Sequence, residues 1–154
     1  MSKPSFVYVT FIATTREKLW QALVDPDVMR QYWIGLNPDS LAHVNVSDWK
    51  PGSRWEHQHQ NEARTVDIVG KVIECSPPRR LVYSWARPSE ENDETKHSVV
   101  TFEIEQRTAA IVKLTVTHDR LEPDPKMLAG ISGGWPQILS NLKSLLETGR
   151  PLPR

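Results

Sequence analysis

Histidines are the side chains of this sequence whose type and spacing best suit chemistry. His57 and His59 are two residues apart in an alternating segment, and His118 ends a later one. Side chains two apart in a strand point to the same face, so His57 and His59 can lie together, and His118 could face them across a sheet. Grouped imidazoles could form a polar spot in an apolar pocket, act as general bases or bind a metal ion.

The sequence favours the first of these roles. Strong zinc signatures add cysteines or pair two histidines four apart on a helix, and neither pattern occurs. Cys75 is the single cysteine, and without a neighbouring base we interpret it as a small, half-buried hydrophobic residue. No phosphate-binding loop or nucleophile elbow is found, and the acidic run at 90–94 is typical of a solvated loop. We therefore predict no catalytic residue, no metal and no cofactor.

Composition limits the partners. Nineteen basic residues balance nineteen acidic ones, so no net charge attracts nucleic acid or an anionic membrane. The longest apolar stretches are far shorter than the roughly 20 residues of a membrane span, and the first residues lack the layout of a secretory signal. A single cysteine excludes an internal disulfide and is typical of a reducing compartment. We expect a cytoplasmic protein with no nucleic-acid partner and no membrane span.

The elements that must position these residues follow from hydrophobic periodicity. Residues 7–12 are β-branched and aromatic, which indicates a strand. Thr14 or Thr15 then caps a short helix, and Asp25 followed by Pro26 ends that helix and begins a second one. After a polar stretch the period becomes alternating, which predicts antiparallel strands joined by turns. These strands lie near residues 44–46, 55–59, 66–72, 81–85, 100–104 and 112–118.

A long helix is predicted at the end of the chain. Apolar residues recur at spacings of three and four from Leu128 to Leu146, and Gly149 is a stop signal. Pro136 cannot donate a hydrogen bond to the carbonyl of Ser132, so the helix should kink or restart there. A kink could lift the first half of the helix off the sheet and open a pocket, or it could only fit the helix to a curved sheet.

These elements predict a single α+β domain covering residues 1–154. The order is one strand, two short helices, a long antiparallel meander and a long helix. A sheet with one apolar face must bury that face, and the C-terminal helix is the only element long enough to cover it. No repeat or linker suggests a second domain.

Three stretches of the chain carry a family resemblance: residues 20–26, 77–85 and the tryptophan–proline helix at 134–147. Over roughly residues 6–148 the sequence resembles bacterial relatives of the activator of heat-shock-protein-90 ATPase, within the START-like (SRPBCC) superfamily. The resemblance implies a helix-grip fold, in which a curved sheet wraps the C-terminal helix and the two short helices close one end of a cavity. It implies no catalytic motif, because superfamily members range from binders of apolar molecules to enzymes.

The expected function is the binding of a small apolar or aromatic, lipid-like molecule between the sheet and the helix. A dry void of roughly 300 Å³ would cost about 7 kcal/mol, so a standing pocket should have polar groups on its wall to hold water. Inward-facing positions of the strands and the helix supply the candidates. The predicted ligand-binding residues are Trp33, Trp55, His57, His59, Tyr83, Trp85, Phe102, Leu114, His118, Met127, Ile131 and Trp135.

Other interpretations remain open at this stage. The same residues could be ordinary core residues or could lie on the solvated face of the sheet. A cyclase-, dehydratase- or hydrolase-like enzyme could use His57 or His118 as a general base, which requires a charged partner in a closed pocket. A protein-interaction or chaperone-assisting role would need a contiguous exposed apolar patch. A homodimer could form through a sheet edge or through the two short helices.

Overall fold

The computed structural model describes residues 5–153 and contains, in this range, one antiparallel sheet of seven strands and three α-helices. The strands are β1 (Phe6–Ile12), β2 (His43–Ser47), β3 (Arg54–His59), β4 (Val66–Ser76), β5 (Arg80–Trp85), β6 (Ser98–Gln106) and β7 (Val112–Asp119). The helices are α1 (Arg16–Val24), α2 (Pro26–Tyr32) and α3 (Pro125–Thr148), with 3₁₀ turns η1 (Pro88–Glu90) and η2 (Glu94–Lys96) between β5 and β6. None of the helices in the described range is long and apolar enough to cross a membrane.

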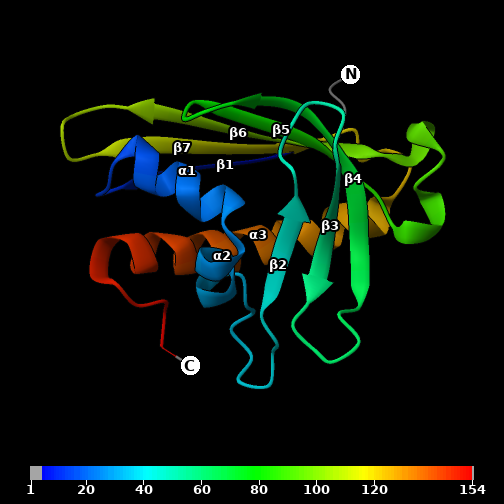
Figure 1. Cartoon of the computed structure of the whole chain (residues 1–154), viewed down its shortest axis with the longest axis horizontal. Helices are drawn as coiled ribbons and strands as arrows, with labels where there is room; N and C mark the ends of the chain where they lie inside the picture. The colour runs from blue at the N-terminus through cyan, green and yellow to red at the C-terminus, as the bar shows by residue number, and fades with distance from the viewer. Residues whose placement is uncertain (1–4, 154) are drawn as a thin grey trace.

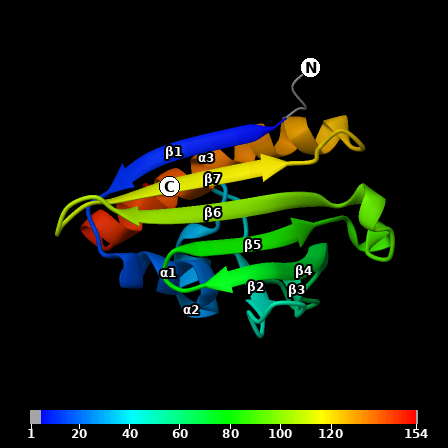
Figure 2. The same cartoon turned by 90° about the horizontal axis from the view of Figure 1, so that it is seen from above.

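The sheet curls around α3. Its strand order is β1-β7-β6-β5-β4-β3-β2, and β2 and β3 run steeply across the direction of β1, β6 and β7 (Figure 1). Seen from above, α3 lies behind β1 and β7, and α1 and α2 lie at one end of the sheet (Figure 2). This arrangement confirms the predicted α+β, helix-grip architecture and the expected order of elements.

Short polar side chains set the limits of the helices. The hydroxyl of Thr15, rather than that of Thr14, caps α1 by accepting from the Lys18 backbone N–H. Asp25 ends α1 and caps α2, where Pro26 occupies the first helical position. At the other end of the chain, α3 ends on Gly149, whose φ of 83° is the left-handed conformation that favours glycine.

Helix α3 continues through Pro136 as one element, so the predicted restart of the helix is wrong. Pro136 removes the backbone donor to the Ser132 carbonyl. Ser132 lies in an exposed part of the helix, where water can replace the lost hydrogen bond. The helix therefore tolerates the proline without a break.

A buried hydrogen-bond chain joins α3 to the sheet. The indole N–H of Trp135 donates to His118 Nδ1 over 3.1 Å, and His118 Nε2 lies 2.7 Å from Ser98 Oγ. A neutral imidazole carries one N–H, so His118 accepts at Nδ1 and donates at Nε2. The hydroxyl of Ser98 then donates to the Trp85 carbonyl over 3.2 Å. Burial lowers the pKa of His118 to about 3, which keeps its ring neutral in the folded protein.

The packing of the sheet also requires a glycine at position 70. This residue of β4 pairs with Trp55 of β3, and the Trp55 indole N–H passes it to donate to the Ser84 carbonyl of β5 over 2.7 Å. A Cβ added at Gly70 would lie only 1.9 Å from the Ser84 oxygen and 2.5 Å from Trp55 Nε1. Glycine is therefore required here by the close approach of an indole to a neighbouring strand.

Replacement of Gly70 by alanine should lower the free energy of unfolding by at least about 2 kcal/mol, because backbone and indole must move apart to admit a methyl group. Urea unfolding followed by tryptophan fluorescence measures this loss. The matched control is Gly133→Ala, since Gly133 is an exposed helical residue whose Cβ would meet nothing within 4 Å. This control should raise stability by up to about 1 kcal/mol. Equal urea midpoints for wild type and Gly70→Ala would contradict the packing argument.

Stability should also fall in acid because of His118. The unfolded imidazole binds a proton near its ordinary pKa of about 6.5, whereas the folded His118 does so only near pH 3. Between these values the unfolded state binds more protons, so the free energy of unfolding falls as the pH drops, by up to about 1.4 kcal/mol per pH unit.

The variant His118→Gln tests this slope, because its amide can accept from Trp135 and donate to Ser98 but does not titrate. Urea unfolding between pH 7 and pH 4 measures the free energy of unfolding. In the variant this free energy should fall less steeply with decreasing pH, by the slope that corresponds to about one bound proton. Parallel curves for the two proteins would show that His118 is not held neutral by the fold.

Candidate functional site

An open cavity lies between the sheet and the first half of α3. Its volume is about 170 Å³, which is below the roughly 300 Å³ at the lower end of typical ligand pockets. Helix α3 forms one wall, and the end of α2 together with β3 and β5 forms the others. The lining residues are Trp33, His57, Trp85, Gly130, Ile131, Gly134, Trp135 and Ile138.

Aromatic rings in mutual contact form most of the wall. The ring centroid of Trp135 lies 5.5 Å from that of Trp33 and 5.7 Å from that of Trp85, while Trp33 lies 5.1 Å from His57. These separations are typical of favourable edge and offset contacts. Trp55, which does not line the cavity, packs against Trp85 with ring centroids 5.6 Å apart. The tryptophans therefore interlock, yet they leave a preformed space beside α3.

Two glycines of α3 create this space. Gly130 and Gly134 are four residues apart and so lie on one face of the helix. A Cβ added at either position would meet no atom within 4 Å. The helix thus presents bare backbone to the cavity between Ile131 and Ile138, and a flat group can approach it closely.

His57 supplies the polar group of the wall. Its Nδ1 lies 2.6 Å from Asn45 Oδ1, and both side chains are buried. Burial holds the pKa of His57 well below its ordinary value, and the nearby His43 and His59 lower it further. The ring is therefore neutral, donates from Nδ1 to the side-chain oxygen Oδ1 of Asn45, and keeps its lone pair on Nε2. Among residues 5–153, no hydrogen-bond partner of His57 Nε2 is found.

Five of the twelve predicted site residues line the cavity: Trp33, His57, Trp85, Ile131 and Trp135. The structure places another four in the hydrophobic core rather than on the cavity wall, namely Trp55, Tyr83, Phe102 and Leu114. They alternate with the outward residues of their strands as predicted, but they lie on parts of the concave face that the cavity does not reach.

The other three predicted residues have supporting or separate positions. Met127 lies behind the wall, where its sulfur accepts from the Trp85 indole N–H at 3.3 Å. His118 holds the indole of Trp135 and does not reach the cavity. His59 does not line the cavity and contacts Asp67 at 3.0 Å.

Sequence reasoning missed three lining residues. Ile138 belongs to the apolar stripe of the predicted helix, but the stripe does not distinguish a cavity wall from core. Neither Gly130 nor Gly134 is among the predicted site residues. The signal that could have found both is their spacing of four residues beside Ile131 and Ile138.

The arrangement expected of a general base is not present at His57 or His118. The partner of His57 is the neutral Asn45, and the partners of His118 are Trp135 and Ser98. Within the described residues, the histidine–carboxylate contacts join His43 and His59 to Asp67. These contacts lie outside the cavity.

Comparison with known proteins supports the family suggested by the sequence. Residues 13–147 match the family described as activator of Hsp90 ATPase homolog 1-like protein. A search of curated proteins gave no significant match.

Many solved structures share the fold. A protein from Mesorhizobium loti is 25% identical, with a TM-score of 0.69 over 93% of this chain and 96% of the other. The Aha1 dimer from Colwellia psychrerythraea is 20% identical, with a TM-score of 0.72 over 95% and 98% of the two chains. An HSP90 activator from Plasmodium falciparum is 21% identical, with a TM-score of 0.70 over 92% and 95%.

The match to the family covers most of the chain, and the sheet, the long helix and the two short helices agree with it. The protein therefore belongs to the activator of Hsp90 ATPase homolog 1-like family.

Proposed function

We propose that the protein binds a small, flat, largely apolar molecule in the cavity between α3 and the sheet. The observation that supports this best is the composition of the wall. Three indole rings and two isoleucines surround one neutral imidazole, which is the pattern of an apolar pocket with a single orienting polar group.

The size of the cavity favours a ligand of one or two rings. An apolar cavity of about 150 Å³ can hold benzene, and the present cavity measures about 170 Å³. A long acyl chain or a polyketide would require the wall to open. The bare backbone at Gly130 and Gly134 suits a planar group that lies against the helix.

His57 should select ligands that carry a hydrogen-bond donor. Its Nε2 is the acceptor of the wall, since Nδ1 is committed to Asn45. A matching N–H or O–H on the ligand would contribute about 1 kcal/mol, or about a fivefold gain in affinity. The general-base alternative has less support, because a neutral amide does not stabilise a protonated imidazole as a carboxylate does.

Indole and indene provide a test, because the two molecules have nearly the same shape and only indole has an N–H. We expect both to shift the indole N–H signals of Trp85 and Trp135 in NMR spectra, with indole binding about fivefold tighter. Gly134→Leu should fill the cavity and abolish both responses.

The matched control for that variant is Gly133→Leu, which makes the same change one residue away on the exposed side of α3. It should leave both affinities unchanged while giving a similar gain in helix propensity. The proposal fails if neither compound shifts these signals, or if the two glycine variants bind equally well.

We also propose that β1 joins two copies of the protein. Within residues 5–153, β1 is an edge strand whose one neighbour in the sheet is β7, and edge strands offer unpaired backbone groups. Three apolar side chains alternate along its outer face, namely Val7, Val9 and Phe11, which are 58%, 48% and 49% exposed. The family member from Colwellia psychrerythraea is described as a dimer, which favours a second copy as the occupant of this surface.

Sedimentation velocity checks this proposal. The wild-type protein should sediment as a dimer at micromolar concentration, and Val9→Lys should sediment as a monomer, since a charge at the centre of the row disfavours its burial. The control Ile73→Lys changes an equally exposed apolar residue on β4 and should remain dimeric. A monomeric wild type, or dissociation by both variants, would exclude β1 as the interface.

We further propose that the protein acts in the cytoplasm. The single cysteine, Cys75, is unpaired and half-buried, and burial raises the pKa of its thiol. An inert free thiol of this kind is typical of a protein in a reducing compartment.

A further inference from the structure

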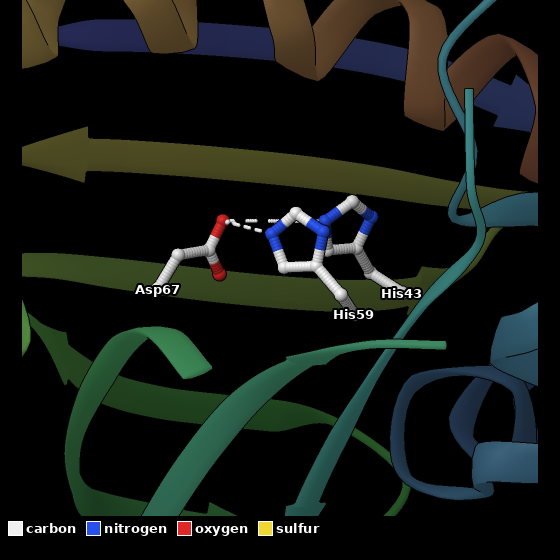
Figure 3. Close-up of side chains that lie close together, drawn as sticks. All are labelled: His43, His59 and Asp67. Atoms are coloured by element: carbon white, nitrogen blue, oxygen red, sulfur yellow. Dashed lines mark hydrogen bonds and ion pairs between the residues drawn. The ribbon is translucent and has the colours of Figure 1, made fainter. Parts of the chain in front are cut away.

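Three metal-binding side chains converge where β2, β3 and β4 meet at the end of the curled sheet. His43 is the first residue of β2, His59 is the last residue of β3, and Asp67 is the second residue of β4. Each offers one ligand atom, and these atoms all lie within 4.8 Å of one another. Figure 3 shows both imidazoles and the carboxylate pointing toward the same spot.

The pairing of β2 with β3 brings the two imidazoles together. His43 and His59 are directly opposite each other in the antiparallel register, so their side chains share a face. Their ring centroids are 4.0 Å apart. Both rings remain accessible to solvent, because the side chain of His43 is 20% exposed and that of His59 is 30% exposed.

An irregularity in β4 brings the carboxylate to the same face. His57 pairs with Ile68 and Gln58 pairs with Val66, so Asp67 is an extra residue without a partner on β3. In a regular ladder Asp67 would pair with Gln58 and point to the other face of the sheet. The bulge instead turns Asp67 toward His59, and bulges of this kind often re-aim a side chain at a functional site.

We propose that His43, His59 and Asp67 form a binding site for a divalent first-row transition metal ion, of which Zn²⁺ is the natural probe. Asp67 Oδ2 lies 3.0 Å from His59 Nε2 and 4.0 Å from His43 Nε2. Ligand atoms about 2.1 Å from a tetrahedral zinc ion are about 3.4 Å apart. The observed distances bracket this value, so small rotations of side chains that are partly exposed would complete the coordination.

The ligand types decide which ions the site accepts. Imidazole nitrogens suit zinc, copper, nickel and iron, whereas calcium and magnesium require a shell of oxygen atoms. Three protein ligands leave at least one coordination position for water or an added ligand, which is the pattern of exchangeable rather than purely structural sites. Asp67 is 45% exposed, so the ion can enter from solvent.

Neighbouring groups hold the ring of His43 in its orientation. Its ring stacks on His57 with centroids 4.6 Å apart and planes 6° from parallel, and it forms a hydrogen bond to the backbone of Leu41. Such outer contacts orient ligating imidazoles in metalloproteins.

The site is separate from the cavity, so the proposal does not depend on the proposed function. His57 lies between the two: it stacks on His43 and lines the cavity through the same ring. His57 itself does not belong to the group of converging ligand atoms. A metal ion at His43 would therefore bind next to the cavity wall without entering the cavity.

Calorimetric titration of the tag-free full chain with Zn²⁺ tests the proposal. We expect one equivalent to bind, and NMR signals of the His43 and His59 rings to shift while those of His118 stay unchanged. Asp67→Asn keeps the shape of the side chain but removes its charge, and it should weaken binding by about tenfold or more. His43→Gln should weaken it at least as much.

The matched control is His97→Gln. His97 belongs to the loop before β6, where its ring contacts Ser84 Oγ and the backbone oxygens of Glu90 and Glu91. This variant should bind Zn²⁺ as the wild type does, and backbone NMR spectra would confirm that all variants are folded. The proposal is overturned if the folded wild type takes up no Zn²⁺. It is also overturned if His43→Gln and Asp67→Asn bind as tightly as the wild type, or if His97→Gln loses binding.

Discussion

The structure depends on providing acceptors for buried indole N–H groups. A tryptophan contributes much apolar area to a core, but its N–H must find a partner when it leaves water. Trp135 of α3 donates to His118, Trp55 donates to the Ser84 carbonyl, and Trp85 donates to the sulfur of Met127. Each of these bonds joins two different elements. They therefore align α3 with the sheet and hold the strands of the sheet in register.

The same bonds help to keep open the space that the glycines of α3 create. The N–H groups of Trp85 and Trp135 are engaged with Met127 and His118, which disfavours rotation of the two indoles into the space opposite Gly130 and Gly134. An apolar void usually costs stability, but this one opens to solvent and has the imidazole of His57 on its wall. The family to which the chain belongs is described by the activation of Hsp90 ATPase, and the cavity wall of this member consists mainly of apolar and aromatic side chains around one neutral imidazole.

The histidines show how the surroundings divide one residue type among several roles. His118 has both nitrogens satisfied in the core and acts as a structural link. His57 is held neutral by burial, and one of its nitrogens remains available at the cavity. His43 and His59 lie near the surface beside Asp67. Burial and the identity of the partners, rather than the residue type, separate these roles.

Periodicity along the chain predicted every strand, both short helices and the long helix, because the spacing of apolar residues reports which face of an element is buried. The family resemblance, rather than periodicity, implied the helix-grip architecture. It did not separate the cavity wall from the core: Trp55 and Trp85 alternate in the same way, and only one lines the cavity. Nor could it predict the place of Asp67, since a bulge is a change of register between two strands. Both depend on contacts between residues far apart in the chain, and local sequence patterns carry no record of those contacts.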